Sequence, residues 1–152
     1  MLLEPLIEPV DQSASKGVCA SVTAHSPTQR ILLVDDDAKL RELYARVLTG
    51  SGYQVDTAPD GEAGWLTIYA QSSSDHAYDL IITDNNMPKL TGVGLVKMVR
   101  SAGMTLPIIL ASGNPPDEAD SLQLSALLPK PFSAEELIQT VKETLYFSTY
   151  QQ

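Results

Sequence analysis

The sequence has little cysteine, few basic residues and no long apolar run. Its one cysteine, Cys19, excludes an internal disulfide. The 10 Lys and Arg residues are scattered along the chain against 19 acidic residues, and the formal net charge is -9. Binding to nucleic acid phosphates needs clustered basic side chains, so this charge argues against direct DNA binding. It is compatible with a divalent cation or a basic partner surface.

Membrane signals are also missing. No apolar run approaches the ~18 residues of a membrane-spanning helix. The first residues, MLLEPLIEPVDQ, carry acids and prolines where a secretory signal has a basic start and an apolar stretch. We therefore expect a cytoplasmic protein without a membrane partner. A length of 152 residues allows one domain with a proper core and is too short for two ordinary ones.

The pattern along the chain divides it into three segments. Residues 1–29 are rich in Ser, Thr, Pro and Ala without periodicity, which predicts a disordered leader. Residues 30–147 alternate short apolar runs with helical stripes, and residues 148–152 follow as a tail. Five predicted strands alternating with five helices indicate an α/β fold with a mostly parallel sheet between helices. The predicted strands lie at residues 31–34, 53–58, 78–84, 107–112 and 126–130.

Two helices carry predictions about their apolar faces. The first has a stripe at i, i+3, i+4, i+7 and i+8, formed by Leu40, Leu43, Tyr44, Val47 and Leu48. The last opens with Ser133 and carries Glu136 three residues later, which is a capping box. We expect the aromatic residues that follow this last helix to complete its core face rather than to dock on a partner. These aromatics are Tyr146, Phe147 and Tyr150.

Polar side chains stand at the ends of the predicted strands. The first strand ends in Asp35, Asp36 and Asp37, the third in Asp84, the fourth in Ser112 and the fifth in Lys130. In open parallel sheets, ligands bind outside the carboxyl ends of the strands. Each signal is weak alone, because an aspartate can cap a helix or begin a turn and a lysine can simply be solvated. Together, on one edge of one sheet, they predict a site.

The chemistry of this predicted site is coherent. Adjacent carboxylates repel each other unless a cation lies between them. Carboxylate oxygens suit Mg²⁺, and a lysine can pair with an aspartate or with a phosphate oxygen. A cation, a lysine and a hydroxyl group around one carboxylate can stabilise a phosphoryl group in transfer. The carboxylate would then be a nucleophile that forms an acyl phosphate.

Four motifs resemble the response-regulator receiver domain of bacterial two-component signalling: ILLVDDD, DLIITDNNMPKLTG, PIILASG and LPKPF. The resemblance covers roughly residues 29–145. It implies a flavodoxin-like (βα)5 doubly wound sheet with strand order 2-1-3-4-5. It also implies that a histidine kinase or a histidine phosphotransfer protein supplies the phosphoryl group.

The resemblance assigns roles by position. Asp84 matches the phosphoacceptor, Ser112 the switch hydroxyl and Lys130 the lysine of the motif. Asp36 matches a direct Mg²⁺ ligand and Asp35 one that acts through water, while Asp37 stays free to serve the helix N-terminus. The backbone carbonyl of Asn86 should also face the metal, and the Lys130–Pro131 bond should be cis.

Two features depart from the family pattern. Ser112 and Lys130 are 18 residues apart, about four fewer than usual, and two prolines follow Ser112. The fourth helix should therefore be shortened. Leu127 stands three residues before Lys130, where many receivers carry a ring that swings inward. We expect it to be a core residue, and the Ser112 loop to transmit the signal.

Only 22 residues follow Lys130, which leaves no room for an output domain. We expect a stand-alone response regulator that contacts an unknown protein target and turns over no separate substrate. Whether phosphorylation produces a homodimer stays open. Two rivals remain: a phosphorylation-independent adaptor, and a Mg²⁺-dependent phosphatase with an Asp nucleophile. Such phosphatases carry a second acid where this chain has Asn86.

Overall fold

The computed structural model describes residues 28–74 and 77–150. Five parallel strands form one sheet in the order β2-β1-β3-β4-β5, which confirms the predicted topology. The predicted leader and Cys19 lie outside the described residues, apart from residues 28 and 29. Along the chain the elements are β1 (Arg30–Val34), α2 (Ala38–Gly50), β2 (Gln54–Ala58), α3 (Gly61–Gln71), β3 (Leu80–Asp84), α4 (Gly92–Ser101), β4 (Ile108–Ser112), the 3-10 helix η2 (Ala119–Leu122), β5 (Ala126–Pro129) and α5 (Ala134–Tyr150).

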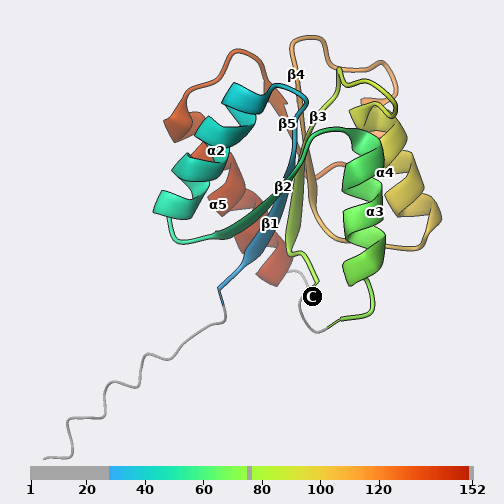
Figure 1. Ribbon diagram of the computed structural model, residues 1–152, viewed down its shortest axis with the longest axis horizontal. Helices are drawn as coiled ribbons and strands as arrows, with labels where there is room; N and C mark the ends of the chain where they lie inside the picture. The colour runs from blue at the N-terminus through green and yellow to red at the C-terminus, as the bar shows by residue number, and fades with distance from the viewer. Residues whose placement is uncertain (1–27, 75–76, 151–152) are drawn as a thin grey trace, which may run out of the picture.

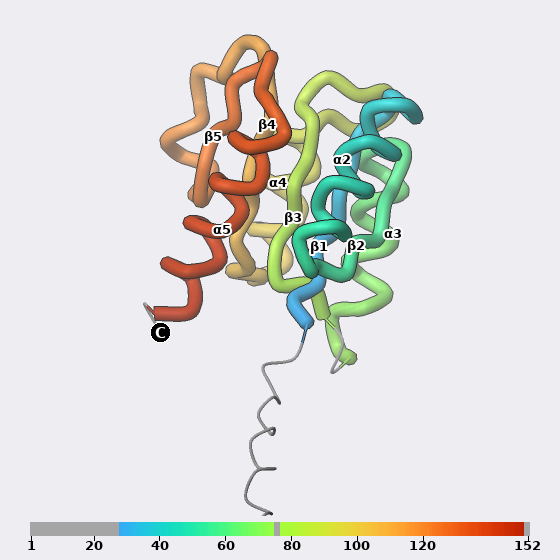
Figure 2. Tube along the Cα trace, turned by 90° about the vertical axis from the view of Figure 1, so that its left-hand side faces the viewer, coloured from blue at the N-terminus to red at the C-terminus, as the bar shows by residue number. Residues whose placement is uncertain are grey.

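The sheet lies between two helical layers (Figure 1). Alternate residues of a strand point to opposite faces, so Ile31 and Leu33 join one core while Leu32 and Val34 join the other. The first core is covered by α2 and α5, and the second by α3, α4 and η2. Figure 2 shows α5 and α2 side by side on the face nearest the viewer. The central strands β3 and β4 are buried along their whole length, as expected for strands covered on both faces.

Helix ends follow the predicted signals. The Asp37 carboxylate accepts hydrogen bonds from the amides of Lys39 and Leu40, so it caps α2. In the capping box before α5, the Ser133 and Glu136 side chains each accept a hydrogen bond from the other residue's backbone amide. The fourth helix is reduced to the four residues of η2, which confirms the predicted shortening. The Lys130–Pro131 bond is cis, also as predicted.

Several predictions about exposure are wrong. Leu43 is half exposed, so the core-facing stripe of α2 is narrower than its spacing suggests. Leu127 is 39% exposed rather than a core residue, because β5 is the edge strand and η2 is short. Helix α5 continues to Tyr150, through three residues that the sequence assigns to a tail. The side chains of Tyr146, Phe147 and Tyr150 are exposed and do not complete the core face.

Candidate functional site

Three aspartates meet at the carboxyl edge of the sheet. Asp35 and Asp36 directly follow β1, and Asp84 is the last residue of β3, the neighbouring strand. One carboxylate oxygen from each lies within 4.8 Å of the others. Asp35 and Asp84 are buried, whereas Asp36 is exposed. The fold therefore brings together the three side chains that the sequence predicts as an acidic pocket.

Lys130 reaches this cluster from the end of β5. Its Nζ lies 2.8 Å from Oδ1 of Asp84, in a charge-assisted hydrogen bond. Burial alone would lower the pKa of Lys130, but its hydrogen bond with Asp84 and the charges of Asp84 and Asp35 outweigh burial and raise it. The lysine is therefore held as an ammonium group against the predicted phosphoacceptor.

Burial, hydrogen bonding and neighbouring charges together set the pKa of Asp35. Burial raises the pKa of its carboxyl, and the neighbouring carboxylates of Asp84 and Asp36 raise it further. The backbone amide of Asp37 donates to Asp35 Oδ1 at 2.9 Å, and this bond together with the charge of Lys130 opposes the rise. The net effect is a raised pKa of Asp35, so its ionised form is disfavoured. A cation in the pocket would favour the ionised form.

The Asp triplet therefore divides into two roles. Asp37 points to the first turn of α2, and its two neighbours form the pocket with Asp84. Of the two explanations that the sequence leaves open, the helix cap is confirmed for Asp37, and the cation site stays a prediction for its two neighbours. An all-oxygen donor set of this charge fits Mg²⁺, a hard cation that prefers carboxylates and water.

Ser112 lies buried at the end of β4, and its hydroxyl is engaged within the loop that follows. Its Oγ donates to the Asn114 carbonyl at 2.7 Å and accepts from the Asn114 amide at 3.1 Å. The backbone amide of Lys130 donates to the Ser112 carbonyl at 3.0 Å. Ser112 is thus at the predicted edge of the sheet, next to Lys130, with its hydroxyl turned into its own loop.

The loop after β3 contains residues that the sequence reasoning missed. The side-chain oxygen of Asn85 accepts from the Val93 amide at 3.1 Å, and its carbonyl accepts from the Gly92 amide at 3.0 Å. A Cβ on Gly92 would overlap the Asp84 carbonyl oxygen and stand 2.8 Å from a Leu110 methyl. These contacts fix the end of β3 against α4. In the sequence, only Gly92, the glycine of the LTG triplet, indicated these contacts.

Asn86 lies in the same loop and is exposed. The role of its carbonyl as a metal ligand stays a prediction. Across the loop, Asp60 is buried and caps α3 through the Ala63 amide at 2.8 Å, and Lys89 Nζ stands 3.7 Å from Asp60 Oδ2. This pair, which no sequence motif indicated, ties the loop to α3.

The family profile of the response regulator receiver domain matches residues 31–142. Among curated relatives, the alkaline phosphatase synthesis transcriptional regulatory protein SphR of Synechococcus elongatus is 32% identical over 90% of this chain and 56% of its own length. The chain spans about half the length of several curated relatives that it matches.

Solved structures of response regulators are also similar to this chain. The chemotaxis protein CheY4 of Vibrio cholerae is 31% identical, with a TM-score of 0.67 over 77% of this chain and 98% of that one. The response regulator protein TrrA of Thermotoga maritima, solved in complex with Mg²⁺–BeF, is 32% identical, with a TM-score of 0.66 over 77% of this chain and 99% of that one. Nearly the whole of each solved chain therefore matches the fold described here.

Proposed function

The chain belongs to the response regulator receiver domain family, and from this premise we propose that it accepts a phosphoryl group on Asp84. The donor would be a histidine kinase or a histidine phosphotransfer protein, and the reaction would depend on Mg²⁺. The phosphorylated protein would signal through contacts with another protein. The observation that carries this proposal is the Asp84 carboxylate 2.8 Å from Lys130, inside a pocket with two further aspartates.

The transfer is a displacement at phosphorus. An Asp84 carboxylate oxygen forms the new P–O bond while the P–N bond to the donor histidine breaks. The electron pair of that bond stays on the imidazole nitrogen, which takes up a proton. Asp35 and Asp36 would hold Mg²⁺, which when bound supplies positive charge beside the phosphoryl oxygens. Lys130 adds a second positive charge beside the Asp84 carboxylate.

The Ser112 hydroxyl is suited to hydrogen-bond the phosphoryl group on Asp84. This hydroxyl now bonds within the loop at Asn114, and a phosphoryl group on Asp84 offers three stronger acceptor oxygens. Turning the hydroxyl toward the phosphoryl group would release the Asn114 carbonyl and amide. The loop after β4 would then change shape, and this is the surface change that a partner would recognise.

We further propose that this receiver acts as a single-domain regulator that binds proteins rather than DNA. The support is its net charge of -9 with scattered basic residues. Some relatives that are about twice as long are named transcriptional regulatory proteins. No helix in the described part of the chain is long and apolar enough to cross a membrane. We also propose cytoplasmic action and no turnover of a separate substrate.

The test is intact mass after incubation with Mg²⁺ and acetyl phosphate. We expect one phosphoryl group on the wild type and none on Asp84→Asn. Asp79→Asn is the matched control, because it removes the same charge just before the same strand, at the opposite edge of the sheet. It should be phosphorylated like the wild type, and a chelator should abolish the adduct on both.

An adduct that persists in Asp84→Asn would contradict the assignment of the phosphoacceptor. No adduct on the wild type, where Mg²⁺ demonstrably binds, would favour a phosphorylation-independent adaptor. Turnover of a model phosphate ester would instead favour the Asp-nucleophile phosphatase.

A further inference from the structure

The last turns of α5 expose an aromatic ridge formed by Tyr146, Phe147 and Tyr150. Their exposed fractions are 59%, 55% and 71%. The Tyr146 ring centroid lies 4.6 Å from that of Tyr150 and 5.8 Å from that of Phe147, so the rings gather into one patch. Clustered exposed apolar side chains mark interaction surfaces more often than scattered ones do. The ridge lies at the sheet edge opposite the aspartate pocket, so phosphoryl chemistry does not explain it.

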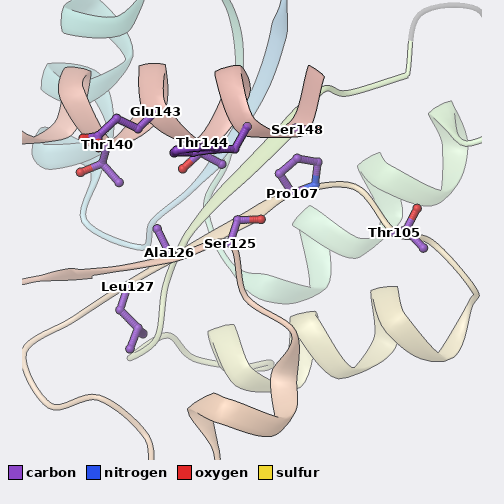
Figure 3. Close-up of a pocket in the computed structure, with 10 residues that line it drawn as sticks. Thr105, Pro107, Ser125, Ala126, Leu127, Thr140, Glu143, Thr144 and Ser148 are labelled. Atoms are coloured by element: carbon purple, nitrogen blue, oxygen red, sulfur yellow. The ribbon is translucent and has the colours of Figure 1, made fainter. Parts of the chain in front are cut away.

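A groove runs along each side of this helix. The first, of about 610 Å³, lies between α5 and the start of β5 (Figure 3). The figure shows Glu143 and Thr140 on the helix above Ala126 and Leu127 of the strand. Among the described residues, Glu143 is the only charged one that lines this groove. We call it the β5 groove.

The second groove, of about 300 Å³, lies on the other side of α5, and we call it the β1 groove. It is lined by Gln29, Tyr53, Lys142, Leu145, Tyr146, Thr149 and Tyr150. Lys142 is the only charged lining residue in the part of the chain that the structure describes. Gln29 directly precedes β1, so the described part of the chain begins at this groove.

Residues 2–10 match the β1 groove in chemistry. They read LLEPLIEPV, with five aliphatic side chains and two glutamates, and the first basic residue of the chain is Lys16. Aliphatic side chains can cover Tyr146 and Tyr150, and a glutamate can pair with Lys142. In the β5 groove the same glutamates would meet Glu143, a like charge. Charge therefore distinguishes two grooves that border one ridge.

The intervening chain is long enough. Seventeen residues separate Val10 from Thr28. At about 3.3 Å per residue they can span up to ~55 Å, several times the radius of a domain of this size. Tethering also raises the local concentration of residues 2–10 at the groove, so a modest contact area is sufficient.

We propose that residues 2–10 dock in the β1 groove, with their aliphatic side chains against Tyr146 and Tyr150 and a glutamate beside Lys142. The docked segment covers part of the aromatic ridge. The contact does not require phosphorylation at Asp84, and it stands independently of the proposed phosphotransfer.

Disulfide trapping in the full chain tests the contact. In a Cys19→Ser background, Leu6→Cys is combined either with Thr149→Cys, in the β1 groove, or with Ser148→Cys, in the β5 groove. The two partner positions are adjacent on the helix, so they form a matched pair. We expect the Thr149 pair to form an intramolecular disulfide at least about tenfold faster, measured by non-reducing intact mass.

Charge variants complete the test. Lys142→Glu should slow trapping at Thr149, whereas Glu143→Lys should not. Equal rates for the two pairs, or faster trapping at Ser148, would overturn the proposal. A disulfide-linked dimer in place of the intramolecular bond would show that the groove takes a second copy of the chain and would overturn it as well.

Discussion

Tyr78 illustrates how one buried side chain can couple stability to pH. Its hydroxyl donates to Asp56 Oδ2 at 2.7 Å, and Arg30 Nη2 lies 2.6 Å from the same oxygen. The Arg30 guanidinium also lies 4.7 Å from the centroid of the Tyr78 ring. Burial, with the hydrogen bond to Asp56 and its negative charge, raises the pKa of Tyr78 from 10.0 to about 12. This cluster lies at the amino ends of the strands, away from the aspartate pocket.

The raised pKa predicts an alkaline loss of stability. Both states keep the phenol proton below pH 10, and above it the unfolded chain releases the proton more readily than the folded one. The contribution of Tyr78 is therefore complete below about pH 10 and is lost as the pH rises toward 12, by at most about 2–3 kcal/mol. Tyr78→Phe should be less stable than the wild type at pH 8 by about 1 kcal/mol but should lose less between pH 9 and 11. Urea unfolding midpoints across this range measure it, and parallel curves would contradict it.

At the scale of elements, the end of β3 packs so closely against the start of α4 that position 92 has no room for a side chain. Gly92→Ala places a methyl group against the Asp84 carbonyl oxygen and Leu110, so strand and helix must move apart. We expect a loss of about 2–3 kcal/mol in unfolding free energy and slower phosphorylation of Asp84. Gly50→Ala, which ends α2 with no atom near its Cβ, is the control and should be neutral or slightly stabilising. Urea unfolding and intact mass measure the two effects, and equal behaviour of the variants would contradict the argument.

The short η2 segment is held from outside, by a side chain on α4. The Arg100 guanidinium donates to the carbonyls of Met104 at 3.0 Å, Leu106 at 2.9 Å and Gln123 at 2.8 Å. Gln123 adopts a left-handed conformation at the end of η2, with φ of 56°. Burial lowers the pKa of Arg100, but three carbonyl acceptors retain its charge in the fold. One guanidinium thus provides ordering that a longer helix would give through its own backbone.

Removing this guanidinium should loosen the segment. Arg100→Ala should reduce the unfolding free energy by about 2–3 kcal/mol and should speed amide hydrogen exchange at residues 119–125. Lys97→Ala is the control. The Lys97 side chain also extends from α4 toward η2, but it makes an exposed ion pair with Glu118 at 3.0 Å. Its loss should cost less than about 1 kcal/mol. Equal exchange rates in the two variants would show that Arg100 does not order the segment.

For the whole molecule, the topological rule that ligands bind at strand ends was sufficient to predict the pocket. Asp35 follows β1, Asp84 ends β3 and Lys130 follows β5, so a parallel sheet places all three at its carboxyl edge. The rule is silent on backbone contacts, such as those of Gly92, which join segments through carbonyl oxygens that carry no sequence signal. The exposure of side chains at the sheet edge and at the end of α5 was harder to predict, because Leu127 and Tyr146 are residue types that often lie in a core. Their exposure depends on what covers β5 and the last turns of α5.

The pocket also links the stability of the whole fold to Mg²⁺. A ligand that binds only the folded state adds about 1.4 kcal/mol at ten times its dissociation constant. For a domain of this size, that raises Tm by roughly 3–5 °C. Thermal unfolding in Mg²⁺, compared with chelator at matched ionic strength, should show this gain. Asp36→Asn should lose most of it, because it removes one carboxylate of the pocket.

Asp37→Asn is the matched control for this prediction. It removes the same charge one residue away, and an asparagine can still cap α2. This variant should keep the Mg²⁺-dependent gain. If both variants lost the gain equally, Mg²⁺ would be acting on the overall negative charge of -9 rather than in a defined pocket. If only Asp36→Asn lost it, the pocket would be a specific cation site that stabilises the entire domain before any phosphoryl group arrives.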